Sequence, residues 1–185
     1  MAHKDKMISN KKTGQIIRFI KTRWETQGRL LEIESTFQAN SKEPPLHYHP
    51  YQEENFLVLS GELTVRIDGE FLRLKAGDTL HVPPNKIHSM WNSSNSQTVV
   101  NWKVKPAMNT DNFLENATGL ANDDKTNHAG VPNLLQVALL ATQFSNVFRL
   151  ANPPFFLQKI IFTLLLPLSY LLGYKGSYRK YTDQN

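Results

Sequence analysis

The sequence predicts an antiparallel all-β domain, a sandwich or a barrel, followed by an α-helical C-terminal extension. Three observations support this fold class. Short runs of β-branched or alternating apolar residues fill the chain up to Pro106. Turn-forming Gly, Pro, Asn and Asp separate these runs at close intervals, which is typical of antiparallel β proteins. After Pro106 the apolar residues gather into longer runs of helical length.

The expected strands alternate apolar and polar residues or are rich in Val, Ile and aromatic side chains. In chain order they are QIIRFIK, RLLEIESTF, NFLVLS, ELTVRI, EFLRL, TLHV and QTVVNWKVK. Asp68 and Gly69 lie between two of them and predict a two-residue hairpin turn of the primed type, in which Gly supplies a positive φ.

The extension is expected to hold a short helix in DNFLENATGLA, a longer helix in NLLQVALLATQFSNVFRLA and a third in FFLQKIIFTLLLPLSYLLG. Pro167 predicts a kink in the third helix, and Gly173 or Gly176 would end it. The expected organisation is therefore a flexible basic tail (1–13), the β domain (14–106), the helical extension (107–174) and a basic polar tail (175–185).

Composition limits the classes of function. The chain of 185 residues has a net charge of +5, carried largely at its ends, and contains no cysteine. Cysteine nucleophiles, disulfides and cysteine metal sites are thereby excluded, and a reducing compartment fits. No apolar signal segment is visible near the N-terminus, so we expect a cytoplasmic protein. We expect no nucleic-acid partner, because no basic recognition helix or aromatic RNA-binding motif occurs.

Metal-binding side chains gather in HYHPYQEENFLVLSG. On a strand, residues two apart point to the same face, so His47 and His49 present two imidazoles side by side. Glu54 begins the next strand, and His88 follows a turn later in the chain. Three imidazoles and one carboxylate suit a divalent first-row metal: Fe, Mn, Co, Ni, Cu or Zn. Strand alternation favours Glu54 over Glu53 as the carboxylate ligand.

These residues resemble the two motifs of the cupin superfamily, G-x5-H-x-H-x3,4-E-x6-G and G-x5-P-x-G-x2-H-x3-N. The first motif matches at His47, His49, Glu54 and Gly61, and the second at Gly77, Pro83, His88 and Asn92. Ser41 replaces the first glycine, and Asn85 replaces the second motif's central glycine. Asn tolerates left-handed backbone, so the turn at Asn85 should survive.

The resemblance implies a small single-domain cupin, a jelly-roll barrel also described as a double-stranded β-helix, with a mononuclear metal at the four ligand positions. It also implies an enzyme acting on a small organic molecule. A dioxygenase-like reaction is favoured, with Glu54 as a ligand and a possible proton acceptor. An isomerase, epimerase or lyase and a non-enzymatic binding or sensing protein stay open.

Apolar residues on the same strand faces would line a substrate pocket: Phe56, Val58, Met90 and Trp102. The alternative is that these side chains simply fill the barrel. His81 is expected to face outward, and His3 and His128 to be solvated.

The extension carries too many apolar residues to stay exposed on all sides. Three arrangements are open: a flank packed on the barrel, a dimer interface, and a peripheral membrane helix with basic anchors. Packing on protein is preferred, with a homodimer as the expected assembly.

Overall fold

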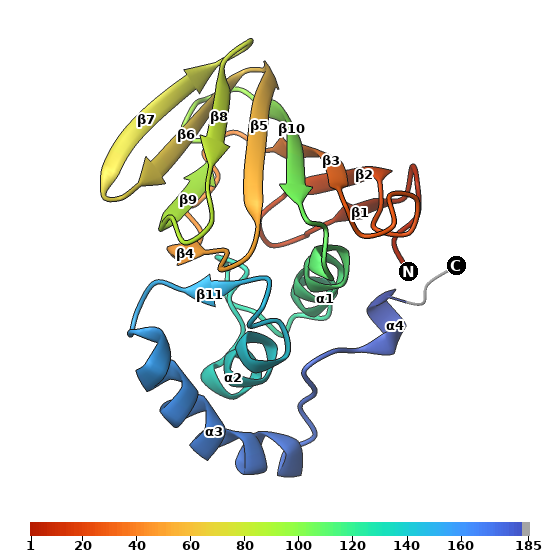
Figure 1. Cartoon of the computed structure of the whole chain (residues 1–185), viewed down its shortest axis with the longest axis vertical. Helices are drawn as coiled ribbons and strands as arrows, with labels where there is room; N and C mark the ends of the chain where they lie inside the picture. Colours follow the sequence, from red (N-terminus) through yellow and green to blue (C-terminus); the bar gives the residue numbers. More distant parts are fainter. Residues whose placement is uncertain (183–185) are drawn as a thin grey trace.

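The computed structural model describes residues 1–182 and contains two antiparallel sheets that face each other, with the helices gathered at one end (Figure 1). One sheet has the strand order β1-β2-β3-β10-β5-β8, and the other has the order β11-β4-β9-β6-β7. The strands are β1 (Met7–Ser9), β2 (Ile16–Lys21), β3 (Leu31–Phe37), β4 (His47–Tyr48), β5 (Glu53–Ser60), β6 (Glu62–Ile67), β7 (Glu70–Lys75), β8 (Thr79–Val82), β9 (His88–Trp91), β10 (Thr98–Lys105) and β11 (Arg149–Leu150). The helices are α1 (Thr110–Asn122), α2 (Leu134–Gln143), α3 (Phe155–Leu171) and α4 (Arg179–Thr182). The predicted fold class, a jelly-roll barrel with a helical extension, is confirmed.

The core lies between the two sheets, as strand alternation predicts. One cluster joins both sheets through buried residues that include Phe56 and Val58 of β5 and Leu63 and Val65 of β6. A second cluster fills the end near the chain's N-terminus, where Phe19 of β2 packs with residues of β3 and β10. Burying a large apolar side chain contributes roughly 1.5–3 kcal/mol, so these clusters hold the sheets together.

Three backbone predictions are confirmed. Asp68 and Gly69 both have positive φ, at 49° and 91°, as a primed hairpin turn between β6 and β7 requires. Asn85 has φ 66° and takes the left-handed conformation of the glycine it replaces. Gly173, with φ 81°, follows α3 and ends it.

The N-terminal segment 1–13 is packed on the molecule, which differs from the flexible tail expected from its charge. Met7–Ser9 forms β1 and pairs with β2, and Ala2 is buried. Lys6 forms an ion pair with the buried Glu115 of α1, with 2.6 Å between Nζ and Oε1. Burial of a carboxylate requires a charged partner, and this need explains why a basic segment is held in place.

The second expected helix is shorter than its apolar run. α2 ends at Gln143, and the chain then turns so that Arg149–Leu150 forms β11, antiparallel to β4. Phe144 and Val147 are buried beside Leu120 of α1. Tertiary burial and pairing with β4 therefore outweigh helix continuation after Gln143.

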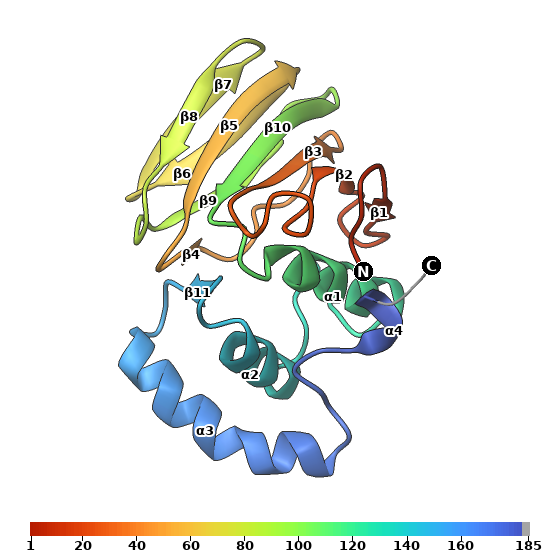
Figure 2. The same cartoon turned by 45° about the vertical axis from the view of Figure 1, so that its right-hand side comes forward.

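The basic end of the chain is also packed as far as the structure describes it. α4 lies against α1 (Figure 2), and Tyr181 is buried there with its hydroxyl donating to Asp123. Gly119 of α1 makes room, because a Cβ at that position would lie 2.3 Å from Tyr181 Cγ. Residues 179–182 of the expected polar tail thus form a packed helix, and residues 183–185 lie outside the described residues.

Candidate metal centre

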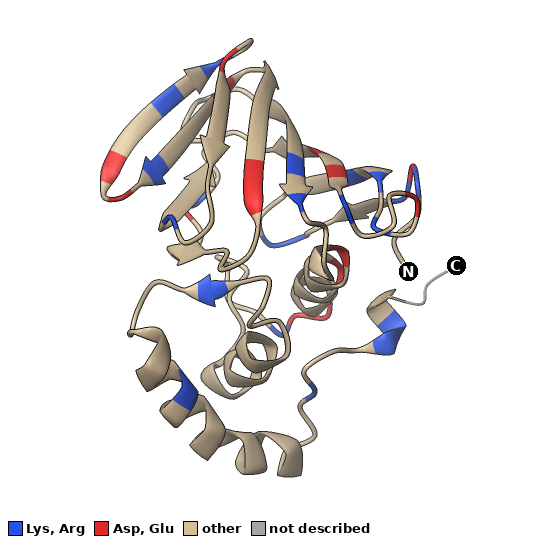
Figure 3. Cartoon of the chain, in the orientation of Figure 1, with Lys and Arg blue, Asp and Glu red and all other residues tan. Residues whose placement is uncertain are grey.

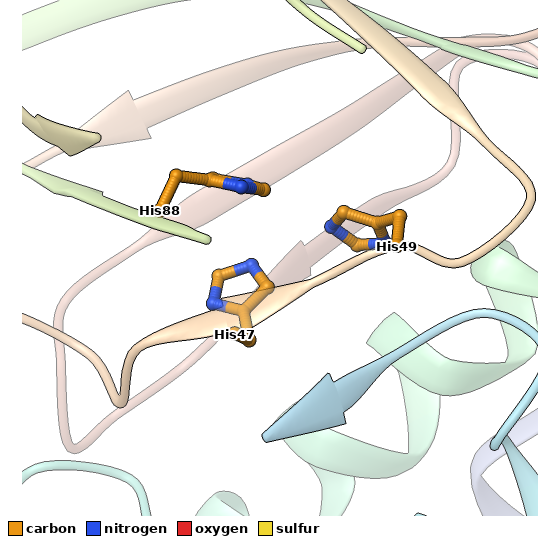
Figure 4. A group of neighbouring side chains, drawn as sticks. All are labelled: His47, His49 and His88. Atoms are coloured by element: carbon orange, nitrogen blue, oxygen red, sulfur yellow. The ribbon is translucent and has the colours of Figure 1, made fainter. Parts of the chain in front are cut away.

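Three imidazoles from separate parts of the barrel converge at its helical end. His47 lies on β4, His49 follows that strand, and His88 begins β9, where it is the cross-strand partner of His47. The ring centroids lie 4.5 to 5.4 Å apart. Figure 4 shows the three rings directed toward one another. One potential ligand nitrogen from each ring lies within 4.8 Å of the other two.

Backbone carbonyls fix which ring nitrogen faces the centre. Nδ1 of His47 lies 2.9 Å from Pro45 O, and Nδ1 of His88 lies 2.9 Å from Lys86 O. Nδ1 of His49 lies 2.5 Å from Val147 O in the C-terminal extension. A carbonyl can only accept, so each Nδ1 must carry the proton and donate it. Each Nε2 is then left with a free lone pair, which is the arrangement usual in metal-binding histidines.

Glu54, the second residue of β5, completes the cluster. Its carboxylate is buried, and its Oε1 accepts a hydrogen bond from Trp102 Nε1 at 3.0 Å. Oε2 lies 2.9 Å from His88 Nε2, and Oε1 lies 3.3 Å from His49 Nε2. Glu53 is on the opposite face, partly exposed beside Lys105. Trp102 therefore orients the carboxylate through Oε1, so that Oε1 faces His49 and Oε2 faces His88.

The electrostatics favour neutral imidazoles at His47 and His49 beside an ionised Glu54, and they differ at His88. Desolvation, reinforced by the neighbouring His88, lowers the pKa of His47 to about 3. Desolvation also lowers the pKa of His49. Burial alone would raise the pKa of Glu54, but His49 and His88 outweigh it and lower that pKa to about 2. Burial opposes protonation of His88 as well, yet the ionised Glu54 carboxylate, whose Oε2 lies 2.9 Å from His88 Nε2, raises the pKa of His88 above the usual value.

The donor set fits a divalent transition metal. Nε2 of His49, Nε2 of His88 and Oε2 of Glu54 are buried and make no well-formed hydrogen bond with any described residue. Unsatisfied buried polar atoms are costly, and several that converge on one point indicate a missing partner. Neutral imidazoles with one carboxylate are ligands that Fe, Mn, Co, Ni, Cu and Zn accept.

A cavity of about 270 Å³ opens beside these residues and is walled mainly by apolar side chains. Met90 and Trp102 line it, together with His47, His49, Glu54 and His88. Phe56 and Val58, also expected in the pocket, are instead buried in the core between the sheets. Alternation placed them on the inner face, but the cavity lies only at the barrel's helical end, so residues farther along β5 fill the core.

The C-terminal extension forms the other side of the cavity. Phe113 of α1, Val137 and Leu140 of α2, and Phe148 line it. The Phe148 ring stacks on His47, with ring centroids 4.8 Å apart and planes inclined by 29°. Sequence reasoning missed Val147 and Phe148 because they lie in a run that reads as helix. No local pattern in the sequence signals their contact with residues a hundred positions earlier.

The remaining histidines lie outside the centre. His81 is exposed on β8, and its Nδ1 lies 3.0 Å from Asn55 Oδ1. His3 and His128 are exposed. The solvent-facing positions expected for all three are those observed.

Comparison with known proteins shows which protein family the β domain resembles. The family model described as "Cupin domain" matches residues 33–102. A quercetin 2,3-dioxygenase of Bacillus subtilis is 35% identical over 75 residues, which are 40% of this chain and 22% of that protein. An oxidoreductase of Arthrobotrys oligospora is 28% identical over 160 residues, 78% of this chain and 62% of that protein. A solved RmlC-like cupin from Shewanella frigidimarina is 20% identical with a TM-score of 0.49, over 60% of this chain and 94% of that one.

Residues 33–102 thus form a cupin domain. This domain carries a helical extension at the C-terminal side, and the matched stretches span less than two thirds of the two curated relatives' length. The region of residues 33–102 contains all four candidate ligands.

Proposed function

We propose that the protein is a metal-dependent cupin enzyme, of the dioxygenase type, acting on a small and largely apolar organic molecule. The observation that carries the proposal is the set of three imidazoles, each held through Nδ1 by a backbone carbonyl, which converge with Glu54 on an apolar cavity. The similarity to a quercetin 2,3-dioxygenase and to an oxidoreductase supports an oxidative reaction over other cupin chemistries.

In this proposal His47, His49, His88 and Glu54 hold one divalent transition metal, which we expect to be Fe, Mn, Ni, Co, Cu or Zn. When bound, the metal would supply Lewis acidity or redox chemistry at positions left open by the protein. Phe148 and Trp102 shape the apolar wall against which a planar substrate could stack. Glu54 is ionised and can accept a hydrogen bond from a substrate hydroxyl, but its lowered pKa makes it a weak base, so its role as a metal ligand is favoured over that of proton acceptor.

Two alternative functions would use the same site. A metal-dependent isomerase, epimerase or lyase would use the same ligands without consuming oxygen. A non-enzymatic binding or sensing cupin would use the cavity without turnover. The cavity of about 270 Å³ lies near the lower end of the usual range for ligand sites, so any ligand should be small or project partly from the mouth.

Elemental analysis followed by oxygen-electrode assays tests the proposal. Purified protein should hold close to one transition-metal ion per chain, and His88→Ala should lose it while the matched His81→Ala retains it. A panel of phenolic and polyketide-like aromatics should then show metal-dependent oxygen uptake in air and no product under nitrogen. Product formed equally well under nitrogen would instead support the isomerase or lyase alternative. Ligand binding without product would support the binding protein.

We keep the cytoplasm as the proposed location, because a cysteine-free chain gains nothing from an oxidising compartment. The proposed homodimer is checked by sedimentation velocity of the same preparation. A small-molecule partner fits the cavity, and we expect no nucleic-acid partner.

A further inference from the structure

The outer face of α3 carries a row of large apolar side chains in solvent, here called the apolar stripe. Its members recur at helical spacing and are between 48% and 82% exposed: Phe156, Ile160, Leu164, Leu168, Leu171 and Leu172. Soluble proteins seldom leave a contiguous row of this kind uncovered, and such rows mark interaction surfaces.

The inner face of α3 fixes the direction of the stripe. Phe162 and Ser169 are buried on the side toward α2, and Ser169 Oγ donates to Leu135 O. The Gln158 amide donates to Leu150 O and to Pro153 O, at 2.8 and 2.6 Å. Figures 1 and 2 both show α2 between α3 and the barrel, with no described element outside α3. The stripe therefore faces outward because the helix is anchored from within.

The Lys and Arg residues of this part of the chain are not balanced by acidic residues. Residues 125–182 contain no Asp or Glu and six cations, whereas residues 1–124 contain equal numbers of acidic and basic residues. Lys159 lies on α3 itself, and Lys175 and Arg179 follow it closely (Figure 3). An interfacial helix is held on an anionic bilayer by burial of its apolar face and by attraction of its cations to the headgroups. A basic segment beside an apolar helix can supply both.

We propose that the apolar stripe of α3 lies in the interface of a membrane containing anionic lipid, with Lys159 and Lys175 at the headgroups. Among the described residues no helix is both long and apolar enough to cross a membrane, so α3 would lie along the surface. The sequence favoured packing of the extension on protein, either the barrel or a second copy of the chain, over contact with lipid. Residues 125–182 contain no acidic side chain that could pair with these cations across a two-fold contact, so an anionic surface complements them better than a second copy of the same segment.

Vesicle co-sedimentation of the full-length protein tests the proposal. Binding should be strong to vesicles of phosphatidylcholine mixed with phosphatidylglycerol and weak to phosphatidylcholine alone. Lys159→Gln with Lys175→Gln should weaken binding to the anionic vesicles by roughly 25-fold, since each cation near such a surface is worth about fivefold. Leu164→Ser should weaken binding to both vesicle types by about tenfold.

Matched controls lie on the barrel. Leu59→Ser removes an exposed leucine of β5, and Arg73→Gln removes an exposed cation of β7, and neither should change binding. Metal content should be the same in all these variants, so the outcome is independent of the proposed function. The proposal is overturned if anionic vesicles fail to bind the protein, or if Leu164→Ser binds like the wild type. A dimer in sedimentation velocity that Leu164→Ser converts to monomer, without vesicle binding, would assign the stripe to a second copy.

Discussion

Trp102→Phe isolates the hydrogen bond that orients Glu54. The phenyl ring should keep the stacking on Phe56, whose ring centroid lies 5.6 Å from that of Trp102, but it cannot donate to Glu54 Oε1. A hydrogen bond to a buried charged group contributes about 1.5–3 kcal/mol. Loss of a group that orients a metal ligand typically lowers metal affinity by about 10–100-fold. We expect a loss in that range, with the barrel still folded.

The assay is competition for Co²⁺ or Zn²⁺ against a chromophoric chelator, with circular dichroism as the check on folding. Trp24→Phe is the matched control, because Trp24 is 58% exposed and lies outside the site. Its metal affinity should equal that of the wild type. If folded Trp102→Phe binds metal within about twofold of the wild type, the carboxylate is oriented by something other than the indole, and our description of the site is wrong.

Three further results are expected. The pKa of His88 is raised while those of His47 and His49 are lowered, so only His88 should take up a proton as the pH falls. Metal affinity measured by chelator competition should therefore fall by about tenfold per pH unit below the pKa of His88. A pH dependence that corresponds to three protons displaced per metal ion, or to none, would contradict this. Lys6→Met leaves Glu115 buried without its partner and should lower the free energy of unfolding in urea by about 3 kcal/mol, with Lys6→Met/Glu115→Gln recovering part of the loss. Gly119→Ala should displace Tyr181 from α1 and cost about 1–3 kcal/mol in the same assay; an unchanged midpoint would show that α4 packs only loosely.

Much of the barrel could be predicted because its signals are local. Period-two alternation places Glu54 inward and Glu53 outward, and the chemistry of Asp68-Gly69 sets a turn whose φ values are those observed. The pocket was harder to predict. Alternation assigns a side chain to a face of the sheet but not to a position along the barrel, so it could not show that Met90 reaches the cavity whereas Phe56 only fills the core.

The ends of the chain and β11 depend on contacts between residues far apart. A basic N-terminal segment reads as solvated until Glu115, buried on a distant helix, is known to need Lys6. A two-residue strand has too few residues to show a period, and residues 149–150 form one only because β4 offers a free edge. Helix propensity in the preceding apolar run therefore gave a prediction that was wrong for this segment.

The helical extension and the candidate metal centre form one structural unit. Val147 O is the partner of His49 Nδ1, the Phe148 ring covers His47, and Leu150 pairs with His47 across β11 and β4. α3 in turn holds β11 through the Gln158 amide, which donates to Leu150 O.

A barrel without these residues would keep all four candidate ligands but would lose the carbonyl that selects the His49 tautomer and the apolar wall over the cavity. Burial disfavours the protonated imidazole, and a hydrogen bond at Nδ1 directs Nε2 toward the metal position. The cupin motifs alone therefore do not complete this site. The same extension carries the apolar stripe on its opposite face, so α3 has α2 and β11 on its inner side and the proposed lipid surface on its outer side.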